Sequence, residues 1–520
     1  MNSEEIKQLE KELWDAADNL RANSKLTAAE YKDPVLGLIL LRYAQNRFEE
    51  ATKTIAPKLV GPRGARRATQ ADYLAAGAML LPEKSQYDYL ANLPEAEDIS
   101  EAVNEAMRAI EANYADLEGI LPKNYQDMDA DLLRELIRVF NKPAVKKLKG
   151  DVFGRIYEYF LMKFSMSGAG AQEGGEFFTP PSLVQLIVNF IEPDHGIVHD
   201  PACGSGGMFV QTGHFVTDHH KAVNEAIKVY GTELKANNAR LAKMNLAIHG
   251  IEGKIIEGNS FYSDPHDLVG KCDFVMANPP FNVNKVDKAR DVVKTDARLF
   301  DDIGIPKADN GNYLWIQYFY HYLNATGRAG FVMASSATDA GGSEKLIRQK
   351  LIETGAVDCI VAVGNNFFYT RSLPCHLWFL DKGKRPENKS KILMIDARNT
   401  FRQVNSKLRD FTPDQSAGLT AILSSYRGAD VSVEFESNPW LRQIFPDGAY
   451  QDTERLCRIV DVAEIAEHGY SLTPGRYVGY SSEIDDEFDY ESRLLELHSD
   501  LAVLHAEAKE LTYKIIDRRT

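Results

Sequence analysis

The sequence predicts an α/β protein with a doubly wound sheet, an N-terminal all-helical domain and a C-terminal helical tail. Short apolar runs alternate with amphipathic stretches from residue 152 to about residue 380, which is typical of a parallel sheet with crossover helices. One apolar run leads into a glycine-rich turn, and another ends at an Asn-Pro-Pro-Phe turn. Apolar residues before residue 145 and after residue 476 follow helical spacing instead.

These patterns divide the 520 residues into three expected parts. Residues 1–145 would form the helical domain, residues 146–475 the domain with the sheet, and residues 476–520 a C-terminal helix. A helix predicted over 151–166 would join the first two parts. One face of the first helix is marked by Ile6, Leu9, Leu13, Ala17 and Leu20.

The glycine-rich turn follows the apolar run 197–200 and predicts a binding loop. Asp200 precedes Gly204, Gly206 and Gly207, and glycines let a ligand approach the backbone. In an open α/β sheet such a turn lies at the carboxyl end of a strand, where cofactors bind. The spacing differs from the dinucleotide pattern G-x-G-x-x-G, and an acidic residue suits an ammonium group, such as that of S-adenosylmethionine. A turn that only reverses the chain is the alternative.

Two further strand ends carry polar residues. The run 227–233 ends at Glu233, whose carboxylate can accept both hydroxyls of a ribose. A covering helix is predicted over 237–249, because its apolar residues follow helical spacing. The run 255–261 places Asn259 where it can meet an adenine edge, and a plain surface loop is the alternative.

The Asn-Pro-Pro-Phe turn follows the apolar run 274–277 and suits chemistry on an amino-bearing ring. Such an amine is a poor nucleophile, because its lone pair is delocalised into the ring. If the Asn278 side-chain oxygen and the Pro279 carbonyl accept from one NH2 group, the lone pair becomes localised. The two prolines would hold the backbone, and Phe281 would stack on the ring. An ordinary strand-ending turn is the alternative.

Together these motifs resemble those of the N6-adenine DNA methyltransferases, and among them the methylation subunit of type I restriction-modification systems. The cofactor loop precedes the catalytic loop, as in one group of that family. The resemblance covers most of the chain: it rests on residues 175–180, 200–207 and 278–281 and extends to 13–18, 31–43, 367–370 and 377–380.

The resemblance implies a doubly wound S-adenosylmethionine-dependent methyltransferase sheet, with S-adenosylmethionine as donor and a target adenine rotated out of the duplex. Asp200 would contact the methionine amino group, and Glu233 the ribose. The implied catalytic residues are Asn278, Pro279, Pro280 and Phe281. The implied cofactor-binding residues are Glu176, Phe177, Phe178, Thr179, Pro180, Asp200, Ala202, Gly204, Ser205, Gly206, Gly207, Glu233 and Asn259. Asn259 departs from the family, which often has aspartate there.

No metal site is expected, because the His and Cys residues lack zinc-site spacing. Cys203 and Cys375 are expected to be packing residues. The five cysteines form no paired pattern, which favours a reducing compartment. The charged segment 1–11 and the lack of a membrane-length apolar run predict neither a signal peptide nor a membrane span, and therefore a cytoplasmic protein.

The formal net charge of −15 suits a DNA enzyme poorly if it acts alone. We therefore expect another subunit to supply the sequence reading and much of the grip on double-stranded DNA. The resemblance implies that this is a specificity subunit, with two methylation subunits for each, and it also allows a restriction subunit. Basic residues concentrate between 51 and 71, which favours a DNA or partner contact, with a solvated insertion as the alternative: Lys53, Lys58, Arg63, Arg66 and Arg67.

The remaining segments give weaker patterns. Residues 282–312 are expected to order only over DNA, and residues 384–467 to be short and irregular. A helix face predicted to lie in the core is marked by Trp315, Tyr318, Phe319 and Tyr322. A heptad seam at the C-terminus predicts docking onto the specificity subunit, with folding back onto its own domain as the alternative: Leu494, Leu497, Leu501, Leu504, Ala508, Leu511 and Ile515. The hinge before it would be 474–477.

Two other functions stay open from the sequence. A methyltransferase of RNA adenine or of protein glutamine would suit the same catalytic turn, although the N-terminal helices and the heptad seam argue against it. A catalytically inactive scaffold of a DNA-binding assembly is the second, and the presence of Asp200, Glu233 and Asn278 argues against it.

Overall fold

The computed structural model describes most of the chain: residues 3–56, 60–61, 64–76, 78–114, 117–148, 150–167, 179–301, 303–307, 310–368, 374–405 and 408–479. Three predictions lie outside these residues. They are the heptad helix at the C-terminus, the cofactor residues Glu176, Phe177 and Phe178, and part of the basic segment between 51 and 71. Within the described residues, no helix is long and apolar enough to cross a membrane.

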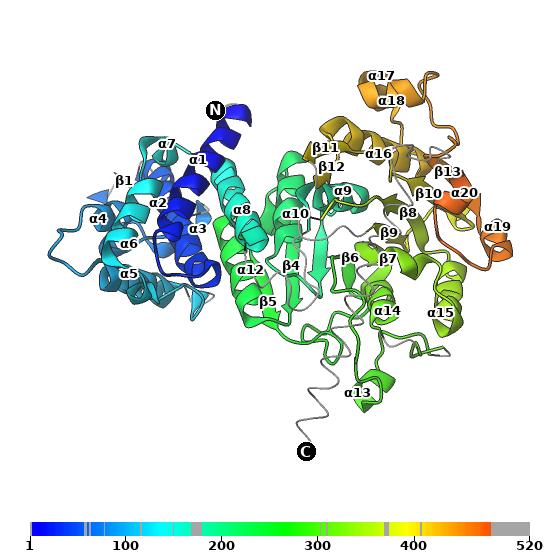
Figure 1. Cartoon of the computed structure of the whole chain (residues 1–520), viewed down its shortest axis with the longest axis horizontal. Coiled ribbons are helices and arrows are strands. Elements are labelled where there is room, and N and C mark those ends of the chain that lie inside the picture. Colours follow the sequence, from blue (N-terminus) through cyan, green and yellow to red (C-terminus); the bar gives the residue numbers. More distant parts are fainter. Residues whose placement is uncertain are drawn as a thin grey trace, which may run out of the picture.

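The N-terminal part is helical, as predicted, with one two-stranded hairpin added (Figure 1). Its elements are α1 (Ser3–Ala22), α2 (Ala28–Ile55), β1 (Val60–Gly61), β2 (Gly64–Ala65), α3 (Gln70–Ala75), α4 (Tyr87–Ala91), α5 (Ile99–Asn113), α6 (Ala130–Phe140), α7 (Pro143–Lys146) and α8 (Gly150–Ser167). Helix α2 forms the centre of the bundle, because its apolar run 35–41 is almost entirely buried. A capping box between Thr27 and Glu30 starts this helix.

The helical domain shares a hydrophobic cluster with α8 and with α12 (Ala236–Ile248) of the sheet domain. Phe160 and Phe164 of α8 pack edge-on against Trp14 of α1, at ring distances of 5.3 and 5.0 Å. Leu241 and Met244 of α12 belong to the same cluster. The cluster therefore continues past residue 145, so the predicted boundary there stays a prediction.

The sheet has nine strands in the order β13-β10-β8-β9-β7-β6-β3-β4-β5. They are β3 (Gly196–Asp200), β4 (Ile227–Glu233), β5 (Gly253–Glu257), β6 (Cys272–Ala277), β7 (Leu323–Ala334), β8 (Val357–Val363), β9 (Cys375–Asp381), β10 (Lys391–Asp396) and β13 (Cys457–Asp461). Neighbouring strands are parallel except at β9 and β13, which run antiparallel to their partners. Strand order reverses between β3 and β6, which creates the switch point expected of a doubly wound sheet.

Helices cover both faces of the sheet. A Cβ on Gly330 in β7 would meet Ile187 of α9 (Pro181–Ile191), whereas the next residue, Phe331, packs against Phe319 of α14 (Asn312–Tyr322). Because consecutive strand residues point to opposite faces, α9 and α14 lie on opposite sides. The buried residues Trp315, Tyr318, Phe319 and Tyr322 confirm the predicted core face of α14.

Further helices complete the domain: α10 (Gly207–Asp218), α11 (Val223–Ala226), α13 (Asp291–Lys294), α15 (Gly342–Glu353), α16 (Pro413–Tyr426), α17 (Ser432–Ser437), α18 (Pro439–Ile444), α19 (Val462–Glu467) and α20 (Gly475–Val478). A second small hairpin is formed by β11 (Arg402–Asn405) and β12 (Leu408–Asp410).

The prediction that residues 384–467 are irregular was wrong. This segment supplies β10 and β13 to the main sheet, and its helix α16 packs against α9. The expected hinge at 474–477 is also packed: α20 contacts β10 and β13, and the Tyr477 hydroxyl donates to the Ser471 carbonyl at 2.5 Å. The sheet therefore extends two strands beyond the predicted end near residue 380.

Candidate active site

Four polar residues predicted from separate motifs lie at the carboxyl ends of four neighbouring strands. Asp200 ends β3 and Glu233 ends β4, while Asn278 directly follows β6 and Asn259 lies two residues after β5. Strands β6, β3, β4 and β5 are adjacent and parallel, so these ends meet at one edge of the sheet. The structure thus brings the glycine-rich turn and the Asn-Pro-Pro-Phe turn together at the switch point.

The glycine-rich turn holds Asp200 in an almost fully buried position. The side chain is 1% exposed, and Oδ1 accepts a hydrogen bond from the Ala202 amide at 2.9 Å. Burial, and then the charge of Glu233, raises the pKa of Asp200 well above its ordinary value. Gly204 and Gly206 adopt φ of +53° and +77°, which L-residues with a Cβ rarely adopt. Gly207 begins α10, and the Ser205 carbonyl accepts from Asn245 at 3.0 Å.

Glu233 is held by backbone amides on both of its oxygens. Oε2 accepts from the Gly204 amide at 2.9 Å, and Oε1 accepts from the Lys235 amide at 2.8 Å. The side chain therefore ties the glycine-rich turn to the end of β4. Its contact with a ribose stays a prediction.

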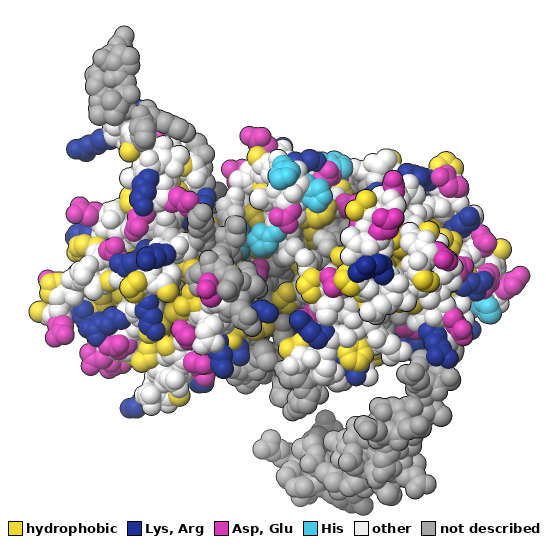
Figure 2. Space-filling model, turned by 90° about the horizontal axis from the view of Figure 1, so that it is seen from above, with side chains coloured by type: hydrophobic (Ala, Val, Ile, Leu, Met, Phe, Trp, Pro, Cys, Tyr) yellow, Lys and Arg dark blue, Asp and Glu magenta, His cyan; other side chains and the backbone are white. Residues whose placement is uncertain are grey.

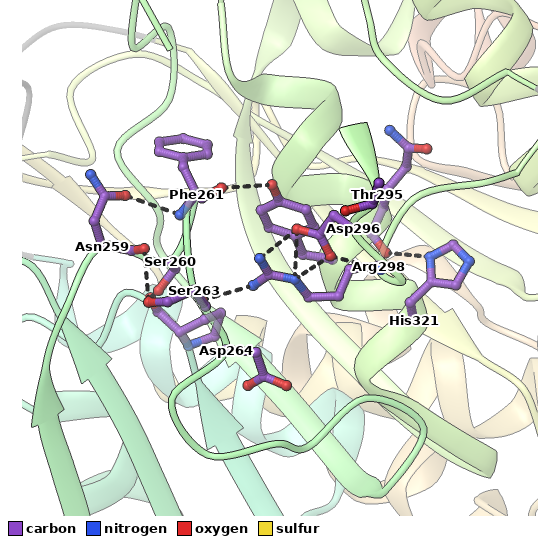
Figure 3. Close-up of polar contacts among 12 residues, drawn as sticks. Asn259, Ser260, Phe261, Ser263, Asp264, Thr295, Asp296, Arg298 and His321 are labelled. Carbon is purple, nitrogen blue, oxygen red and sulfur yellow. Dashed lines mark hydrogen bonds and ion pairs between the residues drawn. The ribbon is translucent and has the colours of Figure 1, made fainter. Parts of the chain in front are cut away.

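Asn259 forms a turn with its own backbone. Its Oδ1 accepts from the Phe261 amide at 3.0 Å (Figure 3). Its carbonyl accepts from the amides of Tyr262 and Ser263 at 2.9 and 3.1 Å. The side-chain oxygen thus caps the loop that follows β5. This contact favours the alternative of a loop residue, and an adenine contact would need the second lone pair of the same oxygen.

Asn278 is joined to the segment that precedes α9. Its Nδ2 donates to the Thr179 hydroxyl oxygen at 2.9 Å, across 99 residues of sequence. Pro180 follows as the N-cap residue of α9. Pro279 is buried, Pro280 is half-buried, and Phe281 is 8% exposed at the edge of the core. Thr179, predicted as a cofactor contact, therefore holds the side-chain amide of Asn278.

Most of the segment after the Asn-Pro-Pro-Phe turn is folded and contains α13, while the prediction that 282–312 orders only over DNA stays a prediction. Arg298 is 2% exposed; it pairs with Asp296 at 2.6 Å and donates to the Tyr322 hydroxyl at 2.8 Å. It also donates to the Ser263 carbonyl at 3.3 Å (Figure 3). The guanidinium carbon lies 4.0 Å from the centre of the Tyr318 ring. Arg298 therefore joins the segment to the Asn259 loop and to α14.

Sequence reasoning missed Arg298, and it also missed the contacts of Asn282 and Asn312 at the base of the same segment. The Asn282 amide donates to Asn312 Oδ1 at 2.7 Å, and Asn312 Nδ2 donates to Asn282 Oδ1 at 2.9 Å. Apart from Asp296, which is two residues from Arg298, the hydrogen-bond partners named here lie 24 to 35 residues away in sequence, so no local spacing indicates them. The one signal was the polar pair Asn282 and Asn312 bounding a segment of mixed charge.

The cysteines and the acidic residues do not form a second chemical centre within the described residues. All five cysteines are buried, and burial raises the pKa of Cys375 to about 12 and that of Cys203 well above its ordinary value. Both thiols are therefore protonated and pack as predicted. Across the part of the chain that the structure describes, no group of three or more His, Cys, Asp or Glu residues is arranged to hold a metal ion.

A hollow of about 430 Å³ lies at the opposite, amino-terminal ends of β3 and β6. It is lined by Glu192, Asp194, His195, Phe215, His219, Asp273, Phe274, Thr326 and Arg328. Because it opens at the other edge of the sheet, it is separate from the candidate active site.

The sheet order and the polar strand ends define the fold of S-adenosylmethionine-dependent methyltransferases. Residues 148–486 match the family model of the N-6 DNA methylases, and residues 9–140 match that of the HsdM N-terminal domain. The chain therefore belongs to the N-6 DNA methylase family, and within it to the methylase subunits of type I restriction-modification systems. This membership supports the DNA methyltransferase interpretation and not the two alternatives.

Two relatives illustrate the match. The type I restriction enzyme MjaIX methylase subunit of Methanocaldococcus jannaschii is 35% identical, over 98% of this chain and 90% of the relative. The HindI methylase subunit of Haemophilus influenzae is 32% identical, over 80% of this chain and 91% of the relative. The type I methyltransferase subunit of Streptococcus thermophilus shares the fold with a TM-score of 0.71, covering 91% of this chain and 99% of that one, at 20% identity.

Proposed function

We propose that this methyltransferase transfers a methyl group from S-adenosylmethionine to N6 of an adenine rotated out of duplex DNA. The observation that carries this proposal is the tethered Asn278 amide, which directly follows β6, the strand paired with β3, and β3 ends at the buried Asp200. One half of the site suits a cationic ligand, and the other half suits an aromatic amine. Adenine is the DNA base that best fits the family's N-6 chemistry.

The residues fit S-adenosylmethionine by their chemistry. Asp200 is a buried carboxylate with a strongly raised pKa, which a ligand ammonium group would lower by pairing with it. Glu233 is a carboxylate held by two backbone amides at the next strand end, and a carboxylate is the group that suits the two hydroxyls of a ribose. When bound, the cofactor supplies an electrophilic methyl group on sulfur.

The catalytic turn acts on the amine. Because Asn278 Nδ2 donates to Thr179, the amide orientation is held and its oxygen is the atom that accepts from the adenine amino group. The Pro279 carbonyl accepts the second N–H, so the nitrogen lone pair is directed at the methyl carbon. With the cofactor bound, N6 would gain the methyl group as the methyl–sulfur bond breaks, the sulfur would keep the electron pair of that bond as a neutral thioether, and N6 would release one proton to water.

We further propose that site selection depends on a specificity subunit, with two methylation subunits for each. The net charge of −15 and the alternation of basic and acidic side chains over the face in Figure 2 argue against an unaided grip on DNA. A solved chain of similar fold comes from a study of the assembly of a type I system, with a TM-score of 0.57. A restriction subunit would join the same assembly.

The test is transfer of labelled methyl from S-adenosylmethionine to duplex DNA, with the chain alone and with its specificity subunit. We expect label only or mainly with the partner present, and nucleoside analysis of the DNA should recover it as N6-methyl-2′-deoxyadenosine. Label in RNA or protein would favour the first alternative. Absence of label with the partner present would refute the proposal.

A further inference from the structure

The residue that follows the catalytic turn is held in an unusual backbone conformation. Asn282 adopts φ of +59°, a left-handed conformation in which Asn is among the few tolerated side chains. Its amide donates to Asn312 Oδ1 at 2.7 Å, and its Oδ1 accepts from Asn312 Nδ2 at 2.9 Å. The Gly311 amide also donates to the Val283 carbonyl at 3.0 Å. The two ends of the segment 282–312 are therefore closed against each other.

The Asn312 end of this contact is rigid. Asn312 is 4% exposed and is the first residue of α14, whose aromatic residues lie in the core. The preceding Gly311 packs closely against Phe261, because a Cβ there would lie 2.7 Å from the Phe261 ring. Asn282, in contrast, is exposed. The buried side-chain amide of Asn312 thus hydrogen-bonds to the exposed Asn282, which directly follows the Asn-Pro-Pro-Phe turn.

We propose that Asn282 and Asn312 form a clamp that positions the catalytic turn for methyl transfer, an inference that rests on the proposed function. The turn is held at its start by β6 and by the Thr179 contact of Asn278, and the clamp holds its other end directly after Phe281. Neither asparagine needs to touch the substrate for this role. Both are positioning residues.

The clamp would act by fixing the relative positions of the groups that contact the adenine. With both ends held, the Asn278 oxygen, the Pro279 carbonyl and the Phe281 ring keep one arrangement, and a displacement of about 1 Å costs roughly 100-fold in rate. The cofactor residues Asp200 and Glu233 lie on other strands and are held by their own backbone contacts. Loss of the clamp should therefore lower kcat and leave cofactor affinity unchanged.

The test uses the full chain with its specificity subunit, single-turnover methylation of duplex DNA, and calorimetric binding of S-adenosylmethionine. Asn312→Ala removes both hydrogen bonds, Asn282→Gly keeps the left-handed backbone and removes one, and Asn282→Asp keeps the backbone preference and the acceptor. Asn324→Ala is the matched control, because its Nδ2 donates to Asp273 Oδ1 at 2.8 Å at the opposite end of β6.

We expect Asn312→Ala to lower the single-turnover rate about 30- to 100-fold. The single-turnover rate of Asn282→Gly should fall less than that of Asn312→Ala, and the rate of Asn282→Asp should stay within about threefold of the wild type. The affinity for S-adenosylmethionine should stay within about twofold of the wild type for all variants. The double variant Asn282→Gly/Asn312→Ala should be no slower than Asn312→Ala, because both changes remove one clamp.

Two results would overturn the clamp: multiplicative losses in the double variant, or a rate for Asn312→Ala equal to that of Asn324→Ala. A loss confined to DNA affinity in the Asn282 variants would assign Asn282 to a DNA contact instead. If Asn312→Ala does not fold, the single-turnover rates of Asn282→Gly and Asn282→Asp test the clamp instead, because Asn282 is exposed and its variants should fold. Equal rates for these two variants would then overturn the clamp. A wild-type protein without any transfer would refute the proposed function, whereas active wild type with unaffected variants would refute only the clamp.

Discussion

At the scale of single residues, the burial of Asp200 is expected to lower the stability of the protein without cofactor, while the same carboxylate is proposed to bind the cofactor. The carboxylate is buried beside Glu233, and the Ala202 amide is its one hydrogen-bond donor that the structure describes. Burying a charge without a cationic partner is unfavourable, and the raised pKa expresses this. A ligand ammonium group would supply the missing charge.

Asp200→Asn should therefore stabilise the protein without cofactor at neutral pH, by roughly 1–3 kcal/mol, while it weakens S-adenosylmethionine binding about 10- to 100-fold. The carboxyl pKa is raised on folding, so its stabilising contribution is complete below the unfolded value near 3.9 and is lost as pH rises through the folded pKa. The stability gain of the variant should thus be largest above that pKa. Urea unfolding at several pH values checks this, and lower stability of the variant at neutral pH would contradict it.

Asn278→Ala should abolish methyl transfer, with at least a 100-fold loss of rate, because the acceptor for the adenine amino group is removed. Cofactor binding should remain within about twofold, since Asp200 and Glu233 are unchanged. Transfer kinetics and calorimetry separate the two effects. Loss of both cofactor binding and methyl transfer would show that Asn278 helps to bind the cofactor, and would contradict its proposed contact with the adenine amino group.

Thr179→Val should lower the rate about 10-fold, because valine has the same shape but cannot accept from Asn278 Nδ2. Thr179→Ser keeps the hydroxyl and should retain most activity. Equal rates for the two variants would mean that the hydroxyl does not orient the amide.

At the scale of elements, the segment 282–312 is a folded arm and not a free loop. Its middle is anchored by Arg298, which pairs with the buried Asp296 and stacks on Tyr318. Its tip carries α13, which projects below the sheet in Figure 1. The loop of Asn259 meets it through the Ser263 carbonyl, so the cofactor side and the catalytic side share one support.

Arg298→Leu should lower the free energy of unfolding by roughly 3–5 kcal/mol, because Asp296 would remain buried without its partner. Arg290→Leu is the control: Arg290 is exposed, lies 3.6 Å from Asp287 and covers the Tyr262 ring, so its loss should cost about 1 kcal/mol or less. Chemical denaturation measures both. Similar decreases in the free energy of unfolding for the two variants would contradict the anchoring role of Arg298.

At the scale of the whole molecule, the helical domain packs onto α12, whose other side covers the sheet near β4 and β5. Helix α12 therefore lies between the N-terminal bundle and strands β4 and β5. Of the basic segment between 51 and 71, Arg66 pairs with Asp72 at 2.6 Å, and its role in DNA or partner contact stays a prediction.

Assembly with the specificity subunit should depend on the heptad seam, which lies outside the described residues. Leu501→Asp/Leu504→Asp should prevent complex formation and leave cofactor binding intact, because a charge at a seam position disfavours helix pairing. Ser499→Asp, off the seam, is the control. Co-purification and sedimentation measure assembly, and a complex that forms normally with the seam variant would place the docking surface elsewhere.

Features that depend on neighbouring residues could be predicted from the sequence, whereas contacts between residues far apart in the chain could not. Asp200, Glu233 and Asn278 each follow directly on a buried strand, so a local pattern was enough to find them. Strand β13 pairs with β10 across about 60 intervening residues, and β10 itself pairs with β8. Nothing local marks those partners, which is why the prediction ended the sheet near residue 380.

The sequence by itself determined the doubly wound sheet, the family and the polar strand ends, because each rests on the period of apolar residues or on a short motif. Only the tertiary structure decided how the motifs are held: Thr179 on Asn278, Asn312 on Asn282, and Arg298 between two loops. These contacts join residues 30 to 99 positions apart. Such pairs depend on how packed strands and helices meet, and polar side chains show their partners only when burial brings them together.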